Sequence, residues 1–186
     1  MKIVERAYNE NHRRALMDAG IHPLLAKIYA ARRIVSAAEL SYSAGALLSP
    51  TLLKGIEQAA LLLADAIQSG KRFLIIADYD ADGATACAVG VRALRAMVGN
   101  SRANVDYMVP DRFKLGYGLS PELVDLAAER RPDLLITVDN GIASVEGVAR
   151  ARSLGIGTLI TDHHLPGAEL PQADCCLLYT SPSPRD

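Results

Sequence analysis

Carboxylates are concentrated in one short stretch of the sequence, RFLIIADYDADGATA, which spans residues 72–86. A mostly apolar run leads directly into Asp78, Asp80 and Asp82, which occupy alternate positions and precede Gly83. Carboxylates a few ångströms apart repel one another, so they must take up protons, stay solvated or bind cations. The spacing therefore predicts a site for divalent metal ions at the end of a buried strand.

Two further apolar runs end in residues that can bind metal. Asp139 follows the run in ITVDNG, and Asp162, His163 and His164 follow the run in LITDHH. In an open parallel sheet, the carboxyl ends of the strands meet at the edge where ligands bind. Mixed aspartate and histidine ligands suit Mn²⁺ or Mg²⁺, and histidine favours Mn²⁺. Two such ions, about 3.5–4 Å apart, are a common arrangement for activating water against a phosphoester.

The elements that must position these residues alternate between strand and helix from residue 72 onward. Short apolar, partly β-branched runs predict strands at 73–77, 105–109, 134–138 and 158–161. Helices are predicted between them at 83–98, 120–130 and 144–154. This alternation, with its short connections, indicates an α/β fold in which a parallel sheet is covered by helices on both faces.

The chain is predicted to have three parts. Residues 1–48 form an N-terminal helical segment, and residues 49–175 form the α/β domain, whose first helix begins near Ser49 and ends at Gly70. The segment CLLYTSPSPRD, residues 176–186, breaks the pattern and resembles the translation of a sequencing-library adapter. The alternative is a natural tail rich in serine and proline. On the adapter interpretation the tail is non-native and the domain is truncated at its C-terminus.

Composition places the chain among ordinary globular proteins. With 186 residues, 50% hydrophobic residues and a net charge of −1, it can bury a core, and it offers no broad basic surface for nucleic acid. Three cysteines without metal-type spacing indicate a reducing, cytoplasmic setting. The N-terminus is too polar for a signal peptide, and no apolar run approaches the roughly 20 residues of a membrane helix.

Alternative roles for the first aspartate cluster fit the residues less well. An EF-hand calcium loop also begins D-x-D-x-D-G, but its twelfth position here is Val89, where a bidentate glutamate is needed. A phosphatase of the haloacid dehalogenase type has Thr or Val where Asp82 stands. Capping of the next helix would explain one of the three carboxylates.

The motifs DYDADG, VDNG and TDHH, in this order and at these strand ends, resemble those of the DHH phosphoesterase superfamily. The longer segments VDYMVPDRFKLGYGLSPELV and GTLITDHHLPG resemble its bacterial 5′→3′ exonucleases specific for single-stranded DNA, and the resemblance extends from residue 1 to Cys175. It implies a Rossmann-like DHH domain and metal-dependent hydrolysis of single-stranded DNA in repair and recombination.

The resemblance also implies roles for individual residues. Four are expected to be catalytic metal ligands: Asp80, Asp82, Asp139 and His163. Asp139 is the candidate to bridge two ions, and Asp78 is expected to bind metal directly or to lie just behind the ligands. His164 is expected to be catalytic, either as a ligand or directly behind one. Asp162 would orient the imidazoles by hydrogen bonding.

The loop VPDRFKLGYGLSP, residues 109–121, is the candidate substrate-binding segment. Gly116 would allow close approach of a ligand, and Arg112 and Lys114 would contact phosphate. Tyr117 would either stack on a base or pack against the domain. The alternative is a solvated connecting loop with ordinary charges.

Further expectations concern the whole protein. The family's fourth motif, its second domain and its OB-fold domain are missing from the chain, so the fragment is expected to be inactive by itself. The resemblance implies single-stranded DNA, a single-strand-binding protein and a helicase as partners. The alternatives are a nano-RNA or cyclic-dinucleotide phosphodiesterase, a pyrophosphatase, or a non-catalytic nucleic-acid-binding module.

Overall fold

The computed structural model describes residues 4–43, 45, 47 and 49–178 of the chain. The chain divides into two compact units, residues 1–48 and residues 49–186. Among the described residues, no helix combines the length and the apolar character needed to cross a membrane.

The first unit is a pair of short helices followed by a helical turn. Asn9 caps α1 (Glu10–Asp18), and Pro23 opens α2 (Pro23–Ala31). A 3₁₀ turn, η1 (Ala37–Leu40), follows with a capping box formed by Ser36 and Glu39. The described residues of this segment therefore contain two α-helices and a 3₁₀ turn.

The second unit is built on a five-stranded, all-parallel sheet with the order β2-β1-β3-β4-β5. The strands are β1 (Arg72–Ala77), β2 (Asn104–Met108), β3 (Leu134–Val138), β4 (Gly157–Asp162) and β5 (Cys175–Leu178). The central strands β1 and β3 are almost continuously apolar because both faces of the sheet are covered. Their carboxyl ends lie side by side at one edge, since Ala77 pairs with Val138.

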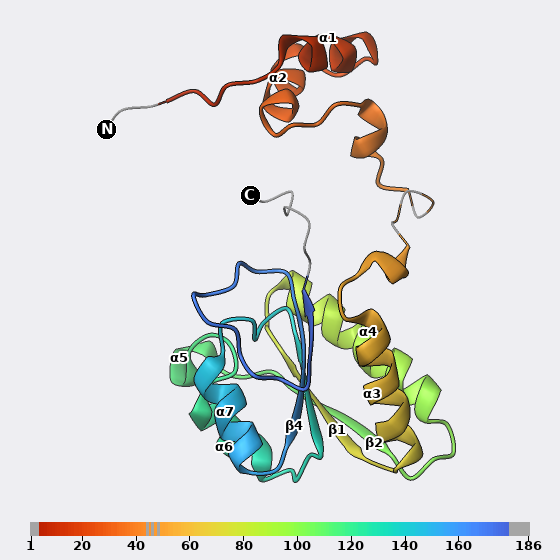
Figure 1. Cartoon of the computed structure of the whole chain (residues 1–186), viewed down its shortest axis with the longest axis vertical. Coiled ribbons are helices and arrows are strands. Elements are labelled where there is room, and N and C mark those ends of the chain that lie inside the picture. Colours follow the sequence, from red (N-terminus) through yellow and green to blue (C-terminus); the bar gives the residue numbers. More distant parts are fainter. Residues whose placement is uncertain (1–3, 44, 46, 48, 179–186) are drawn as a thin grey trace. The chain divides into compact units, whose positions relative to one another are not determined.

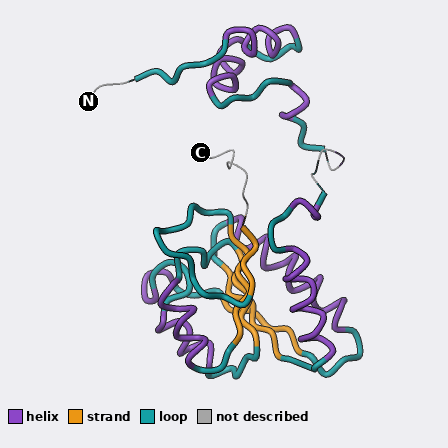
Figure 2. Tube along the Cα trace, in the orientation of Figure 1, coloured by secondary structure: helices purple, strands orange, loops and turns teal. Residues whose placement is uncertain are grey.

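Helices cover both faces of this sheet, as predicted (Figures 1 and 2). On one face, α3 (Ile56–Gln68) and α4 (Ala81–Val98) enclose a core that contains Phe73, Ile75 and Ile136. On the other face, α6 (Pro121–Ala128) and α7 (Val145–Ser153) pack over Leu74, Ile76 and Ile160. The α/β fold class is therefore confirmed.

Three local features differ from the prediction. The helix expected from Ser49 is divided into a 3₁₀ turn, η3 (Pro50–Leu52), and α3, because Gly55 between them has a left-handed backbone with φ of 81°. The loop after β2 contains a short helix, α5 (Arg112–Leu115). The fifth strand was not predicted.

This fifth strand bears on the predicted non-native tail. Its residues 176–178 pair with β4, so the start of that tail belongs to the sheet. Residues 179–186 lie outside the described part of the chain, and the origin of the tail stays a prediction.

Candidate metal centre

The first aspartate cluster lies where β1 passes into α4. Asp80 is the N-cap of α4, and its Oδ1 accepts hydrogen bonds of 3.1 Å from the backbone N–H groups of Asp82 and Gly83. A side chain at Gly83 would place Cβ 2.6 Å from the carbonyl carbon of Asp78. Glycine at this position therefore lets the helix start directly against the strand end and brings Asp78, Asp80 and Asp82 to the edge of the sheet.

Asp139 lies in a tight turn at the end of β3. Its φ is 62°, a left-handed conformation that is uncommon for residues other than glycine. Asn140 stabilises the turn, because its side-chain amide donates to the carbonyls of Ile76 (3.2 Å) and Val138 (2.9 Å). Gly141, at φ of 110°, packs closely on Thr137. The turn holds the Asp139 carboxyl group in a largely buried position, 6% exposed.

Asp162 organises the loop after β4 with both of its carboxylate oxygens. Oδ1 accepts from the backbone N–H groups of His163 (2.7 Å) and His164 (3.0 Å) and bonds to His164 Nδ1 (2.7 Å). Oδ2 accepts from the backbone of Ile142, in the turn after Asp139 (2.9 Å). The carboxylate is thus fully used inside the protein, where it connects the two loops and fixes the ring of His164.

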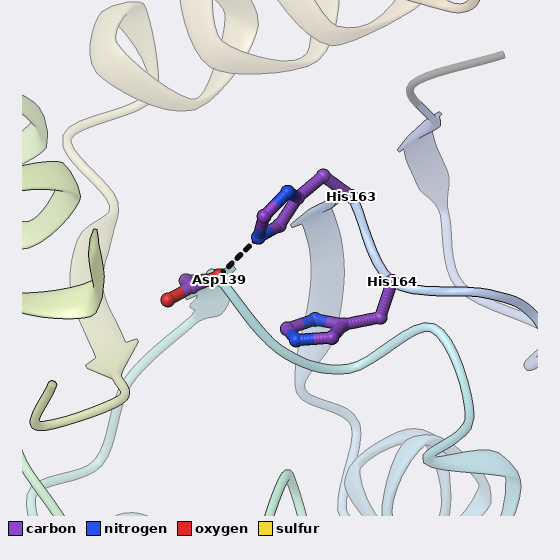
Figure 3. Close-up of side chains that lie close together, drawn as sticks. All are labelled: Asp139, His163 and His164. Carbon is purple, nitrogen blue, oxygen red and sulfur yellow. Dashed lines mark hydrogen bonds and ion pairs between the residues drawn. The ribbon is translucent and has the colours of Figure 1, made fainter. Parts of the chain in front are cut away.

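The two histidines come together with Asp139 at this edge (Figure 3). His163 Nε2 lies 2.8 Å from Asp139 Oδ1, and the two imidazole rings are 4.8 Å apart. Two groups of potential metal ligands result, Asp139–His163–His164 and Asp78–Asp80–Asp139, each with ligand atoms within 4.8 Å of one another. Asp139 belongs to both groups, and its expected role as a bridge between two ions stays a prediction.

Asp82 faces the same region from α4. Together with Asp139 and His163 it lines a hollow of about 310 Å³ at the sheet edge. Neither three-residue group includes Asp82. Its predicted role as a ligand therefore stays a prediction.

Burial and charge shape the electrostatics of the site. Burial raises the pKa of the Asp139 carboxyl, and the hydrogen bond from His163 opposes this effect. Burial, with the nearby Asp162 and Asp139 charges, raises the pKa of Tyr117 to about 12. Tyr117 is therefore a neutral donor at neutral pH. Its hydroxyl lies 3.2 Å from the Asp139 carbonyl and 3.2 Å from His164 Nδ1.

The predicted substrate-binding loop reaches the site through Arg112 and Tyr117. Arg112 bonds to Asp78 and lies 3.7 Å from Asp80. Gly116 has φ of 76° and open space beside it. Lys114, in contrast, is 81% exposed and pairs with Asp111, so the structure does not bring it to the site.

Sequence reasoning missed one residue next to this cluster and underestimated another. Tyr79, between the first two aspartates, places its ring 5.0 Å from the Arg112 guanidinium carbon. Its position beside three acidic residues was the available signal. Asn140, a residue type common in turns, also bonds to the end of the neighbouring strand β1.

The donor chemistry fits a divalent metal. Carboxylate oxygens from the ends of β1 and β3 and two imidazoles from the end of β4 share one edge, which is the mixture that suits Mn²⁺ or Mg²⁺. Asp139 belongs to both groups of possible ligands.

Comparison with known proteins identifies the class. Residues 72–184 match the model of the DHH family, N-terminal domain, and the chain belongs to this family. It is 46% identical over 170 residues to the single-stranded-DNA-specific exonuclease RecJ of Escherichia coli. The aligned residues make up 91% of this chain and 28% of that protein. RecJ of Haemophilus influenzae is 48% identical over 153 residues, 82% of this chain and 26% of that protein.

Solved structures agree with the sequence relationship. RecJ of Thermus thermophilus in complex with Mn²⁺ matches 90% of this chain and 23% of its own, with a TM-score of 0.62 and 33% identity. An exonuclease RecJ bound to manganese matches 68% of this chain and 31% of its own, with a TM-score of 0.61 and 39% identity. The chain spans less than a third of the length of these relatives. The resemblance inferred from the motifs is confirmed.

Proposed function

We propose that the protein to which this chain belongs is a metal-dependent exonuclease that degrades single-stranded DNA from its 5′ end in repair and recombination. The observation that carries this proposal is the position of Asp139 at the sheet edge, where its carboxylate lies within 4.8 Å of possible ligand atoms of Asp80, His163 and His164. The similarity to RecJ proteins supports the choice of single-stranded DNA as substrate.

In this proposal Asp80, Asp82, Asp139 and His163 hold two Mn²⁺ or Mg²⁺ ions. Bound divalent ions lower the pKa of a water ligand and neutralise charge on phosphoryl oxygens. Asp139, which is buried and fixed by its turn, holds its carboxylate close to Asp80 on one side and to the two histidines on the other. Such a rigid arrangement of ligands needs little reorganisation when the phosphate arrives.

Other residues orient the substrate and the ligands. Asp162 fixes the ring of His164 through Nδ1, which leaves Nε2 directed away from that carboxylate. Tyr117 donates or accepts a hydrogen bond at the same imidazole, 3.3 Å from Nε2. Arg112, at the rim of the carboxylate cluster, is the group that contacts phosphate.

The experiment compares the longer protein with its Asp139→Ala variant on 5′-labelled single-stranded DNA with Mn²⁺. We expect a rate at least about 100-fold lower, because a single charge-stabilising group in an active site is worth about that much. Asp106→Ala is the control, since Asp106 lies on the exposed side of β2 and pairs with Arg130. Full activity of a folded Asp139→Ala protein would refute the proposal.

Substrate length separates this proposal from other activities of the family. An enzyme of the kind proposed prefers long single strands, whereas a nano-RNA or cyclic-dinucleotide phosphodiesterase prefers dinucleotides. Failure to bind Mn²⁺ would instead indicate a non-catalytic module. We also propose a cytoplasmic location. The proposed protein partners are a single-strand-binding protein and a helicase, and co-purification from cell extracts tests these two partners.

A further inference from the structure

Both oxygens of the Asp78 carboxylate accept hydrogen bonds from protein donors. Its side chain is 5% exposed. Oδ1 accepts from Arg112 Nε at 2.7 Å and from the backbone N–H of Tyr79 at 2.9 Å, and Oδ2 accepts from Arg112 Nη2. This bidentate contact is the strongest form of arginine–carboxylate pairing.

Two aromatic rings also lie close to the guanidinium group of Arg112. Its guanidinium carbon lies 5.0 Å from the ring centre of Tyr79 and 5.3 Å from that of Tyr117. Each contact of this kind contributes attraction between the cation and the ring electrons. Asp111 caps the short helix that carries Arg112, so the backbone is fixed as well.

Resting on the function proposed above, we infer that Asp78 is a positioning residue for Arg112 and not a metal ligand. A metal ion at Asp78 would compete with a guanidinium that two carboxylate oxygens and two aromatic rings contact. The Nη1 group makes no hydrogen bond to any residue that the structure describes, and the Arg112 side chain is 34% exposed. Arg112 therefore presents free N–H donors, at a fixed place beside Asp80, to a phosphate of the DNA strand.

The first test is Mn²⁺ binding by this chain, measured by electron paramagnetic resonance or calorimetry. Asp78→Asn keeps the shape of the side chain, and we expect its dissociation constant to stay within about twofold of the parent. Asp80→Asn is the matched comparison, and the loss of a ligand is expected to weaken binding at least about tenfold. Equal weakening by both variants would overturn the inference, because Asp78 would then be a ligand.

The second test is binding of a fluorescent single-stranded oligothymidylate in EDTA. Arg112→Gln should bind at least about tenfold more weakly than the parent, and Arg112→Lys should recover part of the affinity because it keeps the charge but not the planar fork. Asp78→Asn should fall between the parent and Arg112→Gln. Oligonucleotide affinity that is unchanged in Arg112→Gln would overturn the phosphate-binding role.

A thermal double-mutant cycle keeps the inference testable if Asp78→Asn is poorly folded. Asp78→Asn and Arg112→Gln should each lower Tm, and the double variant should lose less than the sum of the two. Additive losses would show that the pair does not form. This outcome is distinct from failure of the proposed function, which would appear as DNA hydrolysis by Asp139→Ala.

Discussion

Replacing Asp162 with asparagine tests whether its carboxylate connects the two loops of the site. The side chain is 1% exposed and takes part in four hydrogen bonds. Asparagine has the same shape but only one acceptor oxygen. If that oxygen faces the histidine loop, the new NH₂ group opposes the backbone N–H of Ile142, and if it turns round, three contacts lose their acceptor.

The magnitude follows from these contacts. A buried donor left without a partner costs about 1–3 kcal/mol, and hydrogen bonds to a charged acceptor exceed those to a neutral one by about 1 kcal/mol. Asparagine avoids the desolvation of a buried charge, which offsets part of this loss. We therefore expect Asp162→Asn to lower the free energy of unfolding by about 2–4 kcal/mol.

Urea unfolding of the chain, followed by circular dichroism, measures this loss. Asp125→Asn is the control, because Asp125 is 53% exposed and pairs with Arg150 on the surface. Exposed ion pairs contribute at most about 1 kcal/mol, so this variant should stay close to the parent. Equal stability of the Asp162 and Asp125 variants would refute the role assigned to the Asp162 carboxylate.

Three further predictions address packing and ionisation. In urea titrations, Gly83→Ala should destabilise the chain by about 1–3 kcal/mol, because its Cβ would meet the Asp78 backbone. Gly90→Ala on the same helix is the control. Its Cβ would lie 3.2 Å from the flexible Cδ1 methyl of Ile75, so stability should change by less than about 1 kcal/mol. Burial raises the pKa of Cys176 to about 11, so iodoacetamide at pH 8 should modify it faster in urea than in the folded chain, with Cys176→Ala as the control. Tyr117→Phe should cost about 1 kcal/mol in thermal unfolding, because it removes the hydroxyl that bonds to Asp139 and His164.

The sheet could be predicted where burial on both faces leaves a clear pattern. β1, β3 and β4 are apolar runs with distinct ends, and their bounds lie close to those inferred from sequence. β5 was missed because CCLL is short, lies at the sheet edge and follows a loop without a turn signal. The start of α3 was misplaced because an apolar helical pattern does not show that Gly55 adopts a left-handed conformation.

The site could be predicted only as far as topology determines it. Parallel strands bring their carboxyl ends together, so the meeting of Asp78, Asp139 and His163 follows from the order of the elements. The order of the elements does not determine which side chains pair with one another at this edge. Arg112 lies 34 residues from Asp78 and on a different loop, and its two-pronged contact depends on a backbone path that the sequence pattern leaves open.

The local structure at Asp139 opposes folding, which is the pattern expected if the residue is held for the proposed metal binding. It combines a left-handed backbone, a buried carboxyl and a pKa raised by that burial, and each of these features opposes folding. Asparagine tolerates the same backbone and removes the charge, so Asp139→Asn should leave the metal-free chain as stable as the parent or more stable. Mn²⁺ should raise Tm of the parent but not of this variant, with Asp125→Asn as a responsive control. A loss of metal-free stability in Asp139→Asn would show instead that the carboxylate and His163 form a mainly structural pair.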